Sequence, residues 1–293
     1  VCILTEFFMQ LSMHKSIDTD KNGFRAYGDI NTKSKKKVLF IGNSPTLAID
    51  VSNDKTYYEI LAKELPIEVF AYGGGGFNNI QEYIVLDEFI DVIKPDIIIW
   101  QLCRDNFGGN FYDYTLMSEV TNAQTTPYMT KEGELFYAIP RPIGYIHKLS
   151  NYSRLLYFLL TRRVDDKIYR MNQGEFDKIK KEMALEGKNH PYYKESIEIM
   201  NEIVKKFRIR AKDSKIFAFC VDGSDMFLYD ELKVILERNN IDFIDGIPSA
   251  ITEADKDMFL ARASDKAHWN EYGHKIVADK IKEYLSNNKV LSK

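Results

Sequence analysis

The sequence predicts a doubly wound α/β fold, with a mostly parallel five-stranded sheet and helices on both faces. Short runs of apolar, β-branched residues alternate along the chain with longer segments of helical periodicity. The apolar runs are continuous, which is typical of strands covered on both faces, as in a parallel sheet. Hydrophobic residues make up 45% of the chain and charged residues 28%, enough for a sizeable core in a globular protein.

Five apolar runs are expected to be the strands. Four are clear and the last is weaker, and each has the length of a buried strand. They lie at residues 38–41, 67–72, 96–100, 215–221 and 241–244.

The segments between these runs are expected to be helices that cover the sheet. Each has apolar residues at helical spacing along one side. A strand–helix–strand order of this kind favours a flavodoxin-like sheet, which binds ligands at the carboxyl ends of its strands. The helices are expected at residues 56–65, 80–93, 195–209 and 227–239, with a last one that carries the stripe Ile276, Val277, Ile281, Tyr284 and Leu285.

We expect one domain over residues 37–293, preceded by an N-terminal arm over residues 1–36. A segment at about 107–191 interrupts the alternation and is rich in tyrosine and phenylalanine. Helices are expected within it at about 152–166 and 174–185. A long insertion that leaves the end of a strand is typical of a lid or a substrate-shaping element. A small packing subdomain away from any site is the alternative.

Charge and cysteine content exclude several classes of protein. The net charge of −3 argues against a nucleic-acid partner, and the basic run at 33–37 is expected to be a solvated lead-in to the first strand. Cys2, Cys103 and Cys220 cannot make a disulfide framework, and none has CxxC or metal-ligand spacing. Cys103 and Cys220 are expected to be buried thiols, and no cofactor or metal is expected.

The apolar start of the chain has two readings. No stretch approaches the length of a membrane span. Residues 1–9 are either the trimmed end of a signal or anchor segment, which favours a location outside the cytoplasm, or a buried arm. The compartment and the oligomeric state stay open.

Groups suited to acyl transfer follow the predicted strands. Ser44 comes directly after the first strand, the glycine turn 73–76 follows the second, and polar residues at 101–106 end the third. Asp265 and His268 precede the last helix. A hydroxyl nucleophile, unobstructed backbone N–H groups, an amide and an acid–histidine pair are the parts of acyl transfer.

Each group also has an ordinary structural reading. A serine after a strand is commonly a helix cap or a turn residue. The glycine turn lacks both the GxGxxG spacing and a following Lys-Ser/Thr, which argues against a phosphate site. Asp265 and His268 could be metal ligands, but the other histidines form no second ligand pair. The groups point to chemistry because all are expected at one edge of one sheet.

In this order the motifs resemble those of the SGNH (GDSL-type) hydrolases. Gly42-Asn43-Ser44 is similar to the family's first block, with Asn43 where an aspartate is usual, and the segment 75–83 is similar to the second. Asp265-Lys266-Ala267-His268 is similar to the last block and is the most specific match. The segment Asn22–Arg25 resembles a lead-in that precedes the first strand in some members. The resemblance covers residues 38–106 and 241–286 and leaves the insertion unmatched.

The resemblance implies a serine esterase with assigned roles. Ser44 would be the nucleophile, His268 the general base and Asp265 the carboxylate that orients it. The backbone N–H groups of Ser44 and Gly76 would face the oxyanion. Asn43 would still cap the turn that follows it. The substrate class implied is a small-molecule or carbohydrate ester, with an O-acetyl group on a sugar favoured.

The third block departs from the family order. The family has asparagine then aspartate, whereas this chain has Asp105 then Asn106. In strict register a carboxylate faces the oxyanion, whereas a slipped turn lets Asn106 donate. An O-acyltransferase that uses the same serine, and a catalytically weak binding protein on this scaffold, are the alternative functions.

Overall fold

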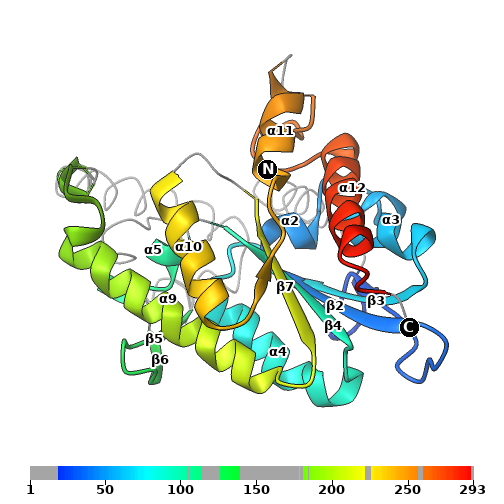
Figure 1. The fold of residues 1–293 in the computed structure, drawn as a ribbon, viewed down its shortest axis with the longest axis horizontal. Coiled ribbons are helices and arrows are strands. Elements are labelled where there is room, and N and C mark those ends of the chain that lie inside the picture. The colour runs from blue at the N-terminus through cyan, green and yellow to red at the C-terminus, as the bar shows by residue number, and fades with distance from the viewer. Residues whose placement is uncertain are drawn as a thin grey trace, which may run out of the picture. The chain divides into compact units, whose positions relative to one another are not determined.

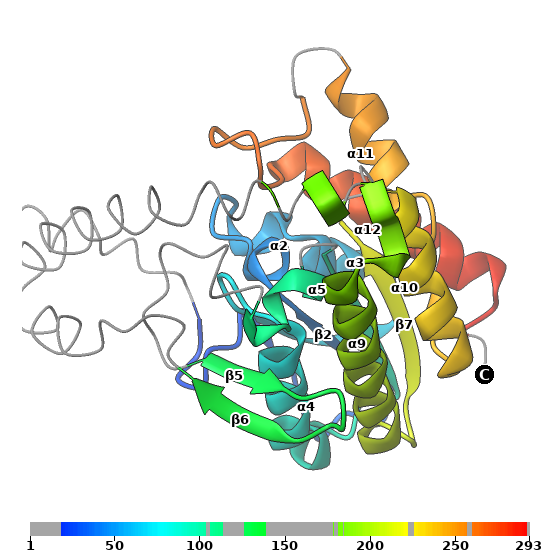
Figure 2. The ribbon, with the colours of Figure 1, turned by 90° about the vertical axis from the view of Figure 1, so that its left-hand side faces the viewer.

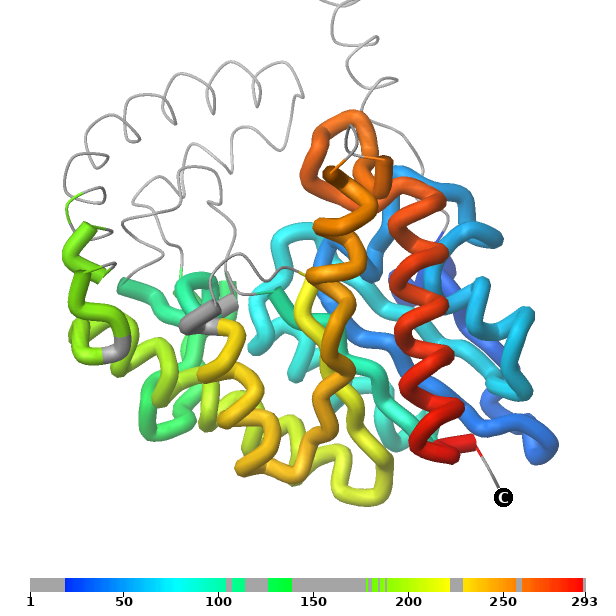
Figure 3. Tube along the Cα trace, turned by 45° about the horizontal axis from the view of Figure 1, so that its top comes forward, coloured from blue at the N-terminus to red at the C-terminus, as the bar shows by residue number. Residues whose placement is uncertain are grey.

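The computed structural model describes the residues drawn in colour in Figure 3, which form two compact units. One unit holds the described residues between Phe107 and Met200, and the other holds the rest. The described residues are 19–103, 106–113, 126–138, 178, 181–183, 185–221, 226–256 and 260–291.

The larger unit is built on a six-stranded sheet with the order β1-β3-β2-β4-β7-β8. All neighbouring strands are parallel except β1, which pairs antiparallel with β3. The five parallel strands have the flavodoxin-like order, in which the chain reverses direction across the sheet between β2 and β4. The doubly wound prediction is therefore confirmed. The strands are β1 (Ala26–Tyr27), β2 (Lys36–Gly42), β3 (Ile67–Gly73), β4 (Ile97–Leu102), β7 (Lys215–Cys220) and β8 (Asp242–Phe243).

The prediction of five strands was wrong by one. The described part of the predicted arm supplies β1, whose Ala26 and Tyr27 pair with Ala71 and Phe70. The rings of Tyr27 and Phe70 pack edge to face, with centroids 5.2 Å apart. A strand of two residues has no hydrophobic period, so only its pairing partner reveals it.

Helices cover both faces of this sheet (Figure 1). Helices α3 (Tyr57–Glu64), α11 (Ile247–Asp255) and α12 (Glu271–Asn287) pack on one face. Helices α4 (Asn79–Ile93), α10 (Met226–Arg238) and the part of α9 (Pro191–Arg210) in this unit belong to the other. The strand side chains that pack on α3, α11 and α12 are Val38, Phe40, Val69, Ala71, Ile97, Ile99, Phe217 and Phe219.

The residues between these strand positions are equally buried. Leu39 and Ile98 are both inaccessible to solvent, although they point to the opposite face. On that face the indole of Trp100 stacks on the ring of Phe207 in α9, with centroids 3.9 Å apart. Burial on both faces is the physical reason why the strands read as continuous apolar runs.

The predicted helices and strands lie within a few residues of the observed ones, and the omissions are short elements. Besides β1, sequence periodicity missed α11 and several shorter elements: α2 (Ser44–Leu47), α5 (Asn106–Gly109), β5 (Thr126–Met129), β6 (Leu135–Ala138) and the 3-10 helices η1 (Asn53–Lys55) and η2 (Gly187–Asn189). Helix α11 starts after Gly246, whose φ of 82° is left-handed, and no side chain caps it. The helix expected at 152–166 lies outside the described residues, and the one at 174–185 is described only in part.

The smaller unit contains a two-stranded antiparallel sheet, labelled β5 and β6 in Figure 2. Strand β5 (Thr126–Met129) pairs with β6 (Leu135–Ala138). The rings of Tyr112, Tyr128 and Phe136 pack together beside it, with centroids 5.1 to 5.8 Å apart. Across both units, none of the described helices is both long and apolar enough to cross a membrane.

Glu82 is a fully buried carboxyl group in α4. Trp100 Nε1 donates to Glu82 Oε2 at 2.7 Å, and Asn79 Nδ2 donates to the same oxygen at 2.6 Å. The other oxygen, Oε1, has no hydrogen-bond partner among the described residues. Burial raises the pKa of Glu82 to about 8, because a charged carboxylate is poorly solvated there.

We expect the buried Glu82 to make the protein less stable as the pH rises. The unfolded carboxyl ionises near its ordinary value of 4.5, whereas the folded one stays protonated to about 8. The contribution of Glu82 to the free energy of unfolding is therefore highest below about pH 4.5, where Glu82 is protonated in both states. It falls progressively between about pH 4.5 and 8, by on the order of a few kcal/mol. Urea unfolding at pH 5 and pH 8 measures this. Glu82→Gln keeps an acceptor for Trp100 and should shrink the difference; an unchanged difference would contradict the assignment.

Candidate active site

Ser44 lies at the junction of β2 and the short helix α2, at the carboxyl edge of the sheet. Pro45 follows it in the first turn of α2. The carbonyl of Asn43 accepts from the backbone N–H groups of Thr46 and Leu47, both at 3.0 Å. A tight turn thus places the serine hydroxyl two residues after the end of β2.

A buried amide, Gln101 of β4, holds this turn. Gln101 Oε1 accepts from the backbone N–H of Asn43 at 3.1 Å and from Thr46 Oγ1 at 3.0 Å. Gln101 Nε2 donates to Asn43 Oδ1 at 3.0 Å, and Asn43 Nδ2 donates to Cys103 Sγ at 3.2 Å. The Asn43 side chain makes no cap bond to α2, so the expectation that it caps the turn was wrong. The side-chain oxygen of Asn43 accepts from Gln101 instead.

Sequence reasoning gave Gln101 no role, although it carried a signal. Gln101 is the one amide in the run Ile97–Leu102, and it is fully buried. Because a buried amide must find hydrogen-bond partners, a glutamine in such a strand indicates a polar network at that position.

The glycine turn after β3 lies directly against α2. A Cβ on Gly73 would lie 2.0 Å from the backbone nitrogen of Leu47, so only glycine permits this approach. The N–H of Gly74 donates to the carbonyl of Gly42 at 3.2 Å, which joins the turn to the end of β2. Gly76 has a left-handed φ of 70°. Its role as an oxyanion donor stays a prediction.

His268 stands in a loop that is pinned before α12. Asn270 accepts from the N–H groups of Tyr272 and Gly273 as the helix cap, and its amide donates to the carbonyls of Leu260 and Arg262, both at 2.8 Å. These bonds tie the two arms of the loop together, which leaves the segment at 265–268 at its tip.

Arg262 reinforces the same loop. Its Nε donates to Asp255 Oδ2 at 2.7 Å, and its Nη1 donates to the carbonyl of Ala267 at 2.7 Å. The backbone position of His268 is therefore held from both sides of the loop.

The three side chains predicted at the site are joined by hydrogen bonds. Ser44 Oγ lies 2.9 Å from His268 Nε2, and His268 Nδ1 is hydrogen-bonded to Asp265 Oδ2. Asp265 Oδ1 also accepts from the N–H groups of Ala267 and His268, at 2.9 and 3.0 Å. These bonds lower the pKa of Asp265 to about 2, and the bond with His268 contributes most. Asp265 is consequently ionised at neutral pH.

Asp50 forms a further part of this cluster that sequence reasoning missed. Asp50 Oδ2 lies 4.0 Å from His268 Nδ1. One ligand atom from each of Asp50, Asp265 and His268 lies within 4.8 Å of the others, the spacing of a possible cation site within the described part of the chain. Both ring nitrogens already have partners in Ser44 and Asp265, so a cation would have to displace Asp265. The donor set fits the hydrogen-bonded arrangement better than a metal centre.

The third predicted block is not decided by the structure. Asp105 lies outside the described residues, and of Asn106 the backbone alone is described, as the first residue of α5 (Asn106–Gly109). Just before them, Cys103 is half-buried rather than fully buried, whereas Cys220 is buried as expected.

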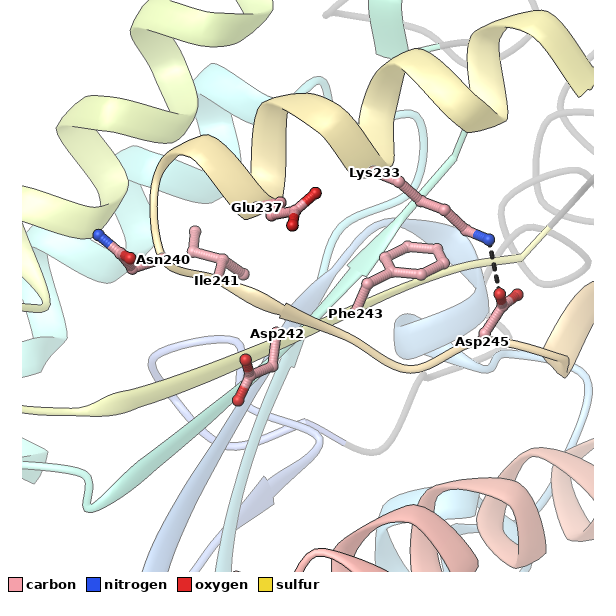
Figure 4. Close-up of a pocket in the computed structure, with 7 residues that line it drawn as sticks. All are labelled: Lys233, Glu237, Asn240, Ile241, Asp242, Phe243 and Asp245. Atoms are coloured by element: carbon pink, nitrogen blue, oxygen red, sulfur yellow. Dashed lines mark hydrogen bonds and ion pairs between the residues drawn. The ribbon is translucent and has the colours of Figure 1, made fainter.

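A surface groove between α10 and β8 is separate from these residues (Figure 4). Lys233 Nζ forms an ion pair with Asp245 Oδ2 at 2.5 Å and lies 5.5 Å from the centre of the Phe243 ring. These internal contacts pair Lys233 with Asp245 without a ligand. Its lining residues are Lys233, Glu237, Asn240, Ile241, Asp242, Phe243 and Asp245.

The fold and the site together define the class of protein: a doubly wound α/β protein with a serine, a histidine and an aspartate hydrogen-bonded in series at the carboxyl edge of its sheet. Comparison with protein-family models found no match. Comparison with curated proteins found none either.

Solved structures similar to this chain include esterases. The crystal structure of TesA is 7% identical, covers 86% of this chain and 99% of its own, and has a TM-score of 0.49. The family 3 carbohydrate esterase of Clostridium thermocellum is 11% identical, with 88% and 100% covered and a TM-score of 0.47. A variant of Axe2, an acetylxylan esterase from Geobacillus stearothermophilus, is 16% identical, with 85% and 94% covered and a TM-score of 0.43. The activities in these names belong to those proteins.

Proposed function

We propose that this protein is a serine esterase of the SGNH type that hydrolyses an O-acyl ester. The observation that carries the proposal is the continuous hydrogen-bonded path from Ser44 Oγ through His268 to Asp265. A hydroxyl alone is a poor nucleophile at neutral pH, and the imidazole of His268 at 2.9 Å is placed to take its proton.

The proposed reaction has two steps. Ser44 Oγ attacks the ester carbonyl while His268 Nε2 takes the hydroxyl proton, and the same proton then passes to the leaving alcohol. The product of this step is an acyl-serine. Water attacks it with His268 again as base, which releases the acid and restores Ser44. Asp265 stays ionised throughout, because its pKa of about 2 lies far below neutral pH.

The proposed oxyanion hole combines backbone and side-chain donors. The backbone N–H groups of Ser44 and Gly76 are two of them, and the side chain of Asn106 is the third if the turn is slipped. In strict register Asp105 takes that place, and its carboxylate donates nothing. The close contact between the glycine turn and α2 supports this assignment, since it brings the second strand's turn next to the serine. Donors held in place before charge develops stabilise the tetrahedral intermediate.

For the substrate we propose an O-acetyl or other short acyl ester on a carbohydrate. The support is the composition of the segment at about 107–191, which is rich in tyrosine and phenylalanine. Aromatic faces stack on sugar rings and line acyl pockets.

Labelling with a fluorophosphonate probe tests the proposal. An activated serine attacks the phosphorus and becomes phosphonylated, whereas an ordinary surface hydroxyl does not. We expect one adduct per chain, located at Ser44 by peptide mass spectrometry and abolished in Ser44→Ala. A folded protein that takes up no probe would support a binding protein instead.

A substrate screen separates the enzymatic alternatives. Acetylated sugars should be deacetylated faster than simple acyl esters of equal chain length. If an added sugar alcohol captures the acyl group in preference to water, the protein is an O-acyltransferase.

A further inference from the structure

Asp50 is a second carboxylate beside His268. Its Oδ2 lies 4.0 Å from His268 Nδ1, the nitrogen that is hydrogen-bonded to Asp265. Its side chain is 30% exposed, compared with 42% for Asp265, so it is the less solvated of the two acids. The imidazole ring therefore has carboxylates from two separate segments of the chain near one nitrogen.

Asp50 belongs to the turn that leaves the serine helix. Ala48 adopts a left-handed φ of 54°, and its N–H donates to the carbonyl of Ser44 at 2.9 Å. This closes α2 after a single turn and directs the following residues back along the site. The position of Asp50 is thus linked by backbone bonds to that of Ser44.

A buried arginine next to the edge strand β1 clamps the same turn. Arg25, just before β1, donates from Nη2 to the carbonyl of Val51 at 2.6 Å and from Nη1 to the carbonyl of Leu47 at 3.2 Å. Its Nε donates to Asn53 Oδ1 at 2.5 Å. Asp50 lies between the two clamped carbonyls, so its place beside His268 is set by the fold.

We propose that Asp50 is a positioning residue that acts with Asp265 to stabilise the protonated form of His268 during catalysis. The inference rests on the proposed esterase function. At 4.0 Å the contact is too long for a hydrogen bond, but charges at that separation attract even in water. Asp265 orients the ring, and Asp50 adds a second negative charge beside it.

The attraction exists only while His268 carries the proton of Ser44. In that step the proton moves from Ser44 Oγ to His268 Nε2, and Asp50 neither gains nor loses one. An interaction made in the transition state but not with bound substrate changes kcat and leaves KM alone. A purely structural role for Asp50 would instead lower stability or alter both constants.

A double-mutant cycle tests the proposal on the full-length protein. We expect Asp50→Asn to lower kcat about fivefold, the size of one charge contact at 4 Å in a solvated setting, with KM unchanged. In the Asp265→Asn background the same change should cost more, roughly tenfold or above, because Asp50 is then the last carboxylate beside the ring. Asp50→Glu, which keeps the charge, should recover most of the lost kcat.

Asp54→Asn is the matched control. Asp54 is an exposed carboxylate four residues further along the same segment, where it accepts from Ser52 Oγ at 2.6 Å. The substitution Asp54→Asn removes the same charge as Asp50→Asn and should leave kcat unchanged. The proposal is overturned if Asp50→Asn has wild-type kcat in both backgrounds, if Asp54→Asn lowers kcat equally, or if KM alone changes.

Two further measurements separate the possible failures. If wild-type Ser44 takes up no fluorophosphonate, the esterase proposal and the role of Asp50 fall together; if it does and Asp50→Asn is unchanged, the role of Asp50 alone falls. Repeating the double-mutant cycle with a chelator tests whether a cation bound at Asp50, Asp265 and His268 causes the effect. If the effect of Asp50→Asn vanishes there, a bound cation explains it and the proposal is wrong. Thermal unfolding of each variant shows that the fold is kept.

Discussion

Ser44→Ala and His268→Ala should each lower the hydrolysis of p-nitrophenyl acetate by roughly 10³-fold or more while the protein stays folded. Ser44 Oγ and His268 Nε2 lie 2.9 Å apart, and in the proposed mechanism they act as one proton-transfer unit, so losing either should remove the activated nucleophile. The double variant should be hardly worse than either single one. Initial rates at saturating ester measure this.

Ser249→Ala is the matched control for the serine variant. Ser249 is an exposed residue of α11 whose hydroxyl donates to the carbonyl of Gly246 at 3.0 Å. Its loss should leave turnover unchanged. Near-wild-type turnover in Ser44→Ala would show that the serine mechanism is wrong.

Whether Asp105 or Asn106 faces the oxyanion should change kcat by about two orders of magnitude. One oxyanion-hole donor contributes roughly 10²–10³ in kcat, because it is in place before the charge develops. If the turn is slipped and Asn106 donates, Asn106→Ala should cost about 10²-fold and Asp105→Asn should change little. We favour this outcome, since the hydrogen-bonded serine, histidine and aspartate are hard to reconcile with a carboxylate that repels the oxyanion.

The opposite pattern has its own signature. If Asp105 faces the oxyanion, Asp105→Asn should raise esterase activity markedly and Asn106→Ala should affect stability alone. Changes of less than about threefold in both variants would mean that no donor acts from this block, and would favour a binding protein. Rates per folded molecule, corrected by circular dichroism, distinguish the three results.

Elements with a repeating pattern could be predicted, and short or unpatterned ones could not. The runs that became β2, β3, β4 and β7 are buried on both faces, so composition alone marked them. Strand β1 has two residues and α2 has four, about one period each, so no hydrophobic pattern can repeat within them. Those elements exist because of their partners, β3 for the first and the glycine turn for the second.

For the candidate site, the sequence indicated which groups meet but not how they are held. Ser44, Asp265 and His268 could be chosen because strand ends and the start of the last helix meet at one edge of a doubly wound sheet. Nothing local marked Asp50, and the amide of Gln101 was visible as an anomaly without a partner. The side chain of Asn43 was expected to cap the turn that follows it. Instead its Oδ1 accepts from Gln101 on the neighbouring strand.

The sequence by itself determined the class of fold, the order of its long helices and buried parallel strands, and the candidate acid–histidine pair, because these depend on periodicity and on residues a few positions apart. The tertiary structure decided the rest. Ser44 and His268 are 224 residues apart in the chain, and packing on the sheet brings their atoms to 2.9 Å. Arg25 places Asp50 beside the same ring through carbonyls of a distant turn. Contacts of this kind are selected by the shape and burial of the whole core, which no local pattern encodes.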